Sequence, residues 1–152
     1  MNTASIYNPK DNQEIIDRIE SLTPLALSQW GKMTVSQMLL HCQMPIKVAF
    51  GTLEVKPQPI LSFLFGKAAK KKLTSKQPFG KGSPTAKEFK ITHEPNFEKS
   101  KKELIELITV FAKDGHASIK LNKHPFFGHM TYEEWDALHW KHLDHHLKQF
   151  GA

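Results

Sequence analysis

The sequence is poor in cysteine and arginine. Among 152 residues, Cys42 is the only cysteine and Arg18 the only arginine. A single cysteine excludes an intramolecular disulfide, and we therefore expect a cytoplasmic protein. Scarce arginine argues against sequence-specific recognition of nucleic acid, because arginine supplies the bidentate contacts to guanine and phosphate. Nucleic acid is accordingly not an expected partner.

Long apolar runs are also missing. No stretch approaches the roughly 18–20 apolar residues of a membrane-spanning helix. The first residues show no basic start followed by an apolar segment, so we expect no secretory signal and no membrane partner. Hydrophobic residues make up 39% of the chain and charged residues 24%, a composition typical of globular proteins. The length suits one domain over residues 1–152.

Apolar residues recur at intervals of three and four along four segments, which predicts four main helices. These segments are residues 11–22, 34–51, 97–113 and 132–150. Thr34 with Gln37, and Thr131 with Glu134, have the spacing of a capping box. No strand pattern is convincing, so we predict an all-α protein and, as the most economical architecture, an antiparallel four-helix bundle.

Two further segments lie outside these four helices. Residues 54–96 are irregular and rich in proline, although residues 60–73 could form a helix with an apolar start and a lysine-rich end. The stretch HPFFG at 124–128 precedes the last helix. Its two phenylalanines either cap a pocket or fill the end of the bundle, and packing is the simpler expectation.

The last helix is rich in histidine. A helical wheel places His139, His142 and His146 on its apolar arc and His145 at the edge of that arc. Residues four apart on a helix lie close enough for both imidazoles to reach one ion at about 2.0–2.1 Å. His142 and His146 have this spacing. His139, His145 and Gln149 are candidates for lining the pocket or for hydrogen bonding to the ligands.

A third metal ligand must come from another helix, and His41 is the best candidate. Its neighbours on the wheel are apolar, which places it on an inward-facing side of the second helix. Cys42 diverges from it by about 100° and is expected to pack in the core. The simpler alternative stays open at this point: two histidines four apart also arise by chance, and buried histidines are often only hydrogen-bonded.

The sequence H142-L-D-H145-H146-L-K-Q149 resembles the H-x-x-H-H-x-x-Q end of the DinB/YfiT-like superfamily of metalloenzymes. Together with MTVSQMLLHC and HPFFGHMTYEEW, it is similar to one subfamily of unknown function, over about residues 15–151. The resemblance implies a four-helix bundle with long crossover connections. It also implies a metal held by His41, His142 and His146. Some relatives are thiol-dependent transferases or isomerases.

Three neutral imidazoles leave at least one coordination position open, as in catalytic rather than structural sites. Zn²⁺ and Ni²⁺ are the expected ions, with Fe²⁺ less favoured. Such a site could activate water or bind a thiolate. The leading hypothesis is therefore a metal-dependent hydrolase or thiol transferase acting on a small molecule, with a low-molecular-weight thiol as a candidate co-substrate. No general base is evident.

The alternative is a non-catalytic binding module. The segment 67–81 is rich in lysine and could meet an acidic partner, a nucleic-acid backbone or a membrane surface. A solubilising lysine face is the simpler interpretation, because arginine and interleaved stacking aromatics are absent. A bundle this small also leaves room for a homodimer through one helix face, although no feature demands one.

Overall fold

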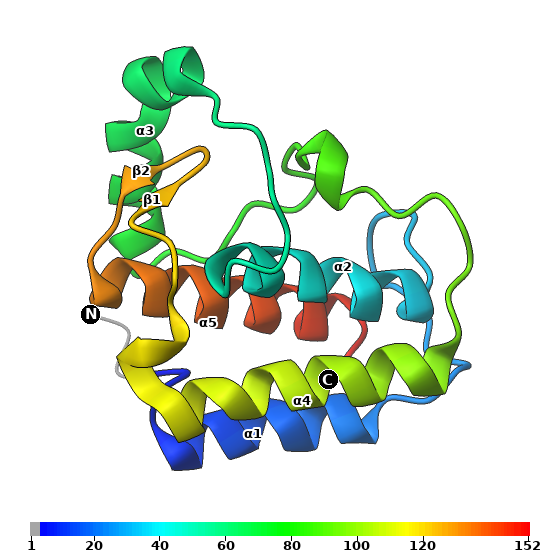
Figure 1. Cartoon of the computed structure of the whole chain (residues 1–152). Helices are drawn as coiled ribbons and strands as arrows, with labels where there is room; N and C mark the ends of the chain where they lie inside the picture. Colours follow the sequence, from blue (N-terminus) through cyan, green and yellow to red (C-terminus); the bar gives the residue numbers. More distant parts are fainter. Residues whose placement is uncertain (1–3) are drawn as a thin grey trace.

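The computed structural model describes residues 4–152 and is mostly helical (Figure 1). Its five α-helices are α1 (Pro9–Ser21), α2 (Val35–Ala49), α3 (Pro59–Thr74), α4 (Phe97–Asp114) and α5 (Tyr132–Gln149). Of two short 3₁₀ helices, η1 (Lys87–Phe89) follows the loop after α3, and η2 (Gly115–Ser118) directly follows α4. The strands β1 (Lys123–His124) and β2 (Gly128–His129) pair as a small antiparallel hairpin. The predicted helical character is therefore confirmed.

Four of the helices form a bundle in which each packs against two others. The packed pairs are α1 with α4, α4 with α2, α2 with α5, and α5 with α1. Figure 1 shows these four helices lying side by side along one common direction, whereas α3 stands across it. The segment between α2 and α4 is a long crossover connection, since it leaves the end of α2 and returns to the start of α4 (Figure 1).

The directions of the helices differ from the predicted antiparallel arrangement. The colours of Figure 1 show α1 and α5 running one way and α2 and α4 the other. The packed pair α1–α5 is therefore parallel. Two hydrogen bonds agree: the backbone N–H of Ile6, before α1, donates to Asp136 near the start of α5, and Arg18 donates to Asp144 near the ends of both helices. The pairs α1–α4 and α2–α5 are antiparallel, and the long crossover makes α2–α4 parallel.

The count of four helices is also incomplete, because α3 forms a fifth helix outside the bundle. Its second half is held against the rest of the fold by two lysines. The amino group of Lys141 on α5 donates to the carbonyls of Lys72, Ser75 and Gln77, and Lys70 pairs with Glu134 at 3.4 Å. Within residues 4–152, no helix combines the length and apolar character required to cross a membrane.

The two helices that carry the candidate ligands begin at the predicted capping boxes. The hydroxyl of Thr34 accepts from the N–H of Gln37, whose side chain accepts in turn from the N–H of Thr34. Thr131 and Glu134 do the same at the start of α5. These bonds satisfy backbone donors that have no partner inside the helix. The caps thereby fix where each helix starts, and hence which of its side chains face the bundle core.

A buried asparagine joins three segments of the apolar core. Asn12 on α1 is 2% exposed, and its amide donates to the carbonyl of Ile6 at 2.7 Å and to that of Ile108 on α4 at 2.8 Å. Both carbonyls belong to residues that are fully buried, so water cannot replace the amide. Asn12 therefore fixes the chain before α1 and the neighbouring helix relative to each other.

We predict that Asn12→Ala lowers the free energy of unfolding by about 2–4 kcal/mol, because two buried carbonyls lose their donor. Urea denaturation measures the change. The matched control is Gln13→Ala on the same helix, where the exposed amide donates only to Asp17 and the expected loss is below about 0.5 kcal/mol. Equal losses in the two variants would show that the buried amide is not a structural link.

Candidate metal centre

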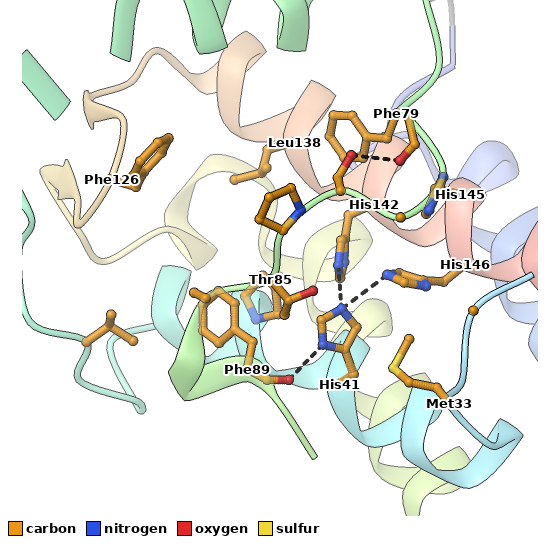
Figure 2. Close-up of a pocket in the computed structure, with 18 of the residues that line it drawn as sticks. Met33, His41, Phe79, Thr85, Phe89, Phe126, Leu138, His142, His145 and His146 are labelled. Atoms are coloured by element: carbon orange, nitrogen blue, oxygen red, sulfur yellow. Dashed lines mark hydrogen bonds between the residues drawn. The ribbon is translucent and has the colours of Figure 1, made fainter. Parts of the chain in front are cut away.

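The structure brings His41, His142 and His146 together. His41 comes from the middle of α2, and the other two lie one turn apart on the facing side of α5. The Nε2 atom of His41 lies 3.1 Å from the Nε2 of His142 and 3.1 Å from the Nε2 of His146. Figure 2 shows the three rings pointing toward one another. One nitrogen from each ring lies within 4.8 Å of the other two, so the three residues could hold one metal ion.

Backbone and amide oxygens fix the protonation of two of these rings. The Nδ1 of His41 lies 2.8 Å from the carbonyl oxygen of Phe89 in η1. The Nδ1 of His146 lies 2.7 Å from the Oε1 of Gln149. A carbonyl oxygen only accepts hydrogen bonds, so each Nδ1 must carry the proton and donate. The Nε2 atom of each neutral ring then carries no proton and presents a lone pair.

The orientation of the Gln149 amide is itself fixed. Its Nε2 donates to the carbonyl of Trp30 at 2.7 Å, which leaves only the oxygen to face His146. Gln149 is 3% exposed, so this chain of hydrogen bonds is shielded from water. The sequence suggested that Gln149 supports a ligand, and the structure places it in contact with His146.

The geometry leaves two lone pairs facing each other. The Nε2 atoms of His41 and His146 are both acceptors and lie 3.1 Å apart. A proton could bridge them only if one ring became an imidazolium. Burial opposes this change: it lowers the pKa of His41 and lowers the pKa of His146 to about 3. Burial, together with His146 and His41, also lowers the pKa of His142 well below its usual value. All three rings are therefore neutral near pH 7, as metal ligands must be.

A divalent cation fits this arrangement. Two nitrogens that occupy adjacent coordination positions at about 2.0–2.1 Å from one ion are separated by about 3.0–3.4 Å. The two Nε2 separations given above fall in this range. The hydrogen bonds at Nδ1 are also the usual partners of metal-bound histidines, since they hold the ring in place and raise its basicity.

The three histidines open onto a cavity of about 700 Å³. Figure 2 shows Met33, Phe79, Phe89 and Leu138 around them, with Phe126 farther along the wall. The cavity walls come from α2, α5, the loop that follows α3 and the HPFFG hairpin. Of the described residues that line the cavity, none is Asp or Glu. Among the described residues, no side-chain carboxylate is therefore in place at the cavity wall to act as a base.

The other histidines singled out from the sequence lie at different distances from the cavity. His145 lines it and packs its ring edge-on against that of Trp30 at 5.5 Å. His139 is 1% exposed, stacks on Trp135 and does not line the cavity. Its Nε2 has no hydrogen-bond partner among the described residues. His139 is thus a core residue, and His145 is a pocket residue. Cys42 is buried and contacts Met38, as predicted for a core position.

Sequence reasoning missed several groups that shape the centre. The carbonyl of Phe89 belongs to η1 and that of Trp30 to a loop, and a backbone carbonyl leaves no signal in the residue type. His124 of the HPFFG motif was also overlooked. Its Nδ1 accepts from the backbone N–H groups of Phe126 and Phe127, and both of these residues line the cavity. The two phenylalanines of this motif therefore line the pocket, and Phe127 also packs against the buried cluster that contains Leu73 and Trp135.

The hydrogen bond from His146 to Gln149 yields a test of the centre. We predict that Gln149→Leu weakens Zn²⁺ binding about 10- to 100-fold, because the ring of His146 loses its acceptor. The matched control is Lys148→Leu, the same kind of change at the exposed neighbouring position of α5, which should stay within a few-fold of the wild type. Titration with a competing chelator measures both affinities. If the leucine variant binds Zn²⁺ as tightly as the wild type, the residue does not position His146.

The buried ring of His139 yields a second test. Burial lowers its pKa to about 3, whereas an unfolded histidine titrates near about 6.5. The unfolded chain therefore takes up a proton first, and stability is lost as the pH falls below about 6.5. We predict that, in a chelator, the wild type loses about 2 kcal/mol more than His139→Leu between pH 7 and pH 5. Denaturant melts at both pH values measure this. Parallel losses would show that the buried ring is not titrating.

Comparison with known proteins identifies a family whose function is unknown. The family DUF1569, described as a protein of unknown function, matches residues 4–152. No curated protein matches the chain, and no solved structure matches it either. Because the match covers nearly the whole sequence, the chain belongs to the DUF1569 family.

Proposed function

We propose that this protein is a metal-dependent enzyme whose three histidines hold a divalent cation at the base of an apolar cavity. The observation that carries the proposal is the pair of Nε2 lone pairs of His41 and His146, 3.1 Å apart and fixed by hydrogen bonds at both Nδ1 atoms. Without a cation this arrangement is repulsive, and burial opposes its relief by protonation.

The donor set favours certain ions. Three neutral nitrogens suit Zn²⁺ and Ni²⁺, and Fe²⁺ less well, because nitrogen ligands generally bind Fe²⁺ more weakly than either of the other two ions. Three protein ligands leave at least one position for water or substrate, which is the pattern of catalytic zinc sites. A bound ion would supply Lewis acidity and lower the pKa of a coordinated water or thiol.

The cavity favours a small, largely apolar substrate. Leu138 and Phe79 present apolar surface near the histidines, and Phe126 does so farther along the wall (Figure 2). The reactions that fit such a centre are hydrolysis and the transfer of a low-molecular-weight thiol, since a thiolate is a good zinc ligand. His145 lines the same cavity without joining the cluster of three, so it is the group we assign to proton transfer.

We further infer that the DUF1569 fold is a variant of the DinB/YfiT-like bundle. The support is that the three histidines come from the second and last helices of a bundle with a long crossover, in the order that the resemblance implies. The fifth helix, α3, would then be an insertion in the crossover. Superposition of an experimental structure on members of that superfamily tests this inference, and a different helix order would reject it.

The metal is tested most simply on untagged protein. We predict about one equivalent of Zn²⁺ or Ni²⁺ by elemental analysis, and its loss in both His41→Ala and His142→Ala. The matched control is His129→Ala, which removes an exposed histidine outside the cluster. Adding the ion at about 100 times its Kd should raise the free energy of unfolding of the metal-free protein by about 2.7 kcal/mol.

Two results would contradict the proposal. One is metal-free protein whose stability does not respond to Zn²⁺ or Ni²⁺. The other is metal that remains bound when His41 and His142 are both replaced, which would locate the ion elsewhere. Circular dichroism of each variant shows whether the helices are retained, so that loss of metal is not confused with loss of fold.

A further inference from the structure

The first half of α3 exposes an unusual amount of apolar surface. Five large hydrophobic side chains within six consecutive positions are solvent-exposed. They are Ile60 (74% exposed), Leu61 (42%), Phe63 (87%), Leu64 (61%) and Phe65 (55%). Each phenylalanine alone carries about 150–250 Å². The largest apolar patch on a typical monomer covers about 300–600 Å², so this surface is at the upper end or beyond it.

The segment around α3 accounts for the net positive charge of the chain. Residues 55–87 contain eight lysines and no aspartate or glutamate. The complete chain has a formal net charge of +6, so the remainder is slightly acidic. Lys67, Lys71 and Lys72 follow the exposed hydrophobic residues within the next two turns of α3, and all three are exposed. Apolar and cationic surface therefore lie next to each other on one helix.

The way α3 is anchored leaves this surface free. Its packed side consists of Gly66 and Leu73, which are buried, and of Lys70, whose amino group pairs with Glu134. The three backbone carbonyls that accept from Lys141 lie at or just beyond its C-terminal end. The N-terminal half stands away from the bundle, as Figure 1 shows. The helix is therefore packed against the fold at its basic end. At its apolar end the N–H of Gln58, just before α3, donates to the carbonyl of Pro125, while the large apolar side chains that follow project into solvent.

We propose that α3 docks this protein onto an anionic lipid surface. Phenylalanine and leucine side chains enter the boundary between headgroups and acyl chains, while lysines pair with acidic headgroups. No span of the bilayer is required, so the proposal agrees with the absence of a membrane-spanning helix among the described residues. It departs from the expectation, drawn from the sequence, that no membrane is a partner.

Two other occupants fit this surface less well. A second copy of this chain, paired through α3, would bring two lysine clusters together without carboxylates from that segment to neutralise them. A nucleic-acid duplex would match the lysines, but it keeps its bases stacked inside and so offers no apolar surface to the projecting phenylalanines and leucines. An anionic bilayer matches both features at once.

The docking surface adjoins the cavity. Leu61 belongs to the exposed apolar group and also lines the cavity that contains the histidines. A docked molecule would thus hold its pocket close to the bilayer, where apolar small molecules concentrate. The docking proposal stands on α3 alone and does not depend on the metal.

The test is flotation of the full-length protein with vesicles. One set contains only phosphatidylcholine, and the other contains about one quarter phosphatidylserine. We expect binding to the anionic vesicles at low salt and a marked loss at about 0.5 M salt, where the Debye length falls below about 5 Å. Lys67→Glu with Lys71→Glu should weaken binding at least about 20-fold, at about five-fold or more per lysine. Phe63→Ser with Leu64→Ser should weaken it by a similar factor.

The matched control is Lys99→Glu with Lys102→Glu, which makes the same charge change on exposed positions of α4. It should retain binding within a few-fold. The proposal is overturned if the wild type does not float with anionic vesicles, or if the control weakens binding as much as the α3 charge variant. A dimer that sediments as such and is abolished by the Phe63 and Leu64 changes, without vesicle binding, would assign α3 to a second copy. Binding to a DNA duplex without vesicle binding would assign it to nucleic acid.

Discussion

The constraint on which the candidate site depends is the approach of unprotonated imidazole nitrogens in a buried place. The carbonyl of Phe89 and the amide oxygen of Gln149 hold protons on the Nδ1 atoms of His41 and His146. The opposite nitrogens are then forced to meet as lone pairs. A cation resolves this repulsion, whereas a proton would have to overcome the desolvation that lowers both pKa values. The arrangement is costly to build without a ligand, and that cost is the reason we propose a metal ion there.

The bundle and the crossover segment contribute different parts of the site. The bundle sets the distance between α2 and α5. The capping boxes fix where these two helices start, and the buried Asn12 fixes the chain before α1 relative to α4. The crossover between α2 and α4 supplies α3, the loop that walls the cavity and the carbonyl that orients His41. The bundle therefore carries the histidines, while the crossover contributes part of the cavity wall and exposes the basic and apolar surface of α3.

The sequence predicted those features that local physics determines. Periodicity and capping gave the helices, and the spacing of His142 and His146 made them neighbours, since both depend on residues a few positions apart. The wheel also placed His41 inward. The direction of packed helices, the exposure of α3 and the carbonyl partners of the histidines could not be predicted. Each depends on where a distant loop lies, and a backbone carbonyl is the same in every residue. From the sequence alone, the apolar residues of α3 predict a buried helix, and only the positions of its neighbours show that they are exposed.

The protonation of the histidine rings is the most direct test of this account. Nitrogen-15 NMR of the metal-free protein at neutral pH distinguishes an Nδ1–H imidazole from an Nε2–H imidazole and from an imidazolium. The account predicts neutral Nδ1–H rings for His41 and His146, with their Nε2 resonances shifting when one equivalent of Zn²⁺ is added. An Nε2–H ring or a charged ring at either position would contradict it, because the two lone pairs would then no longer face each other.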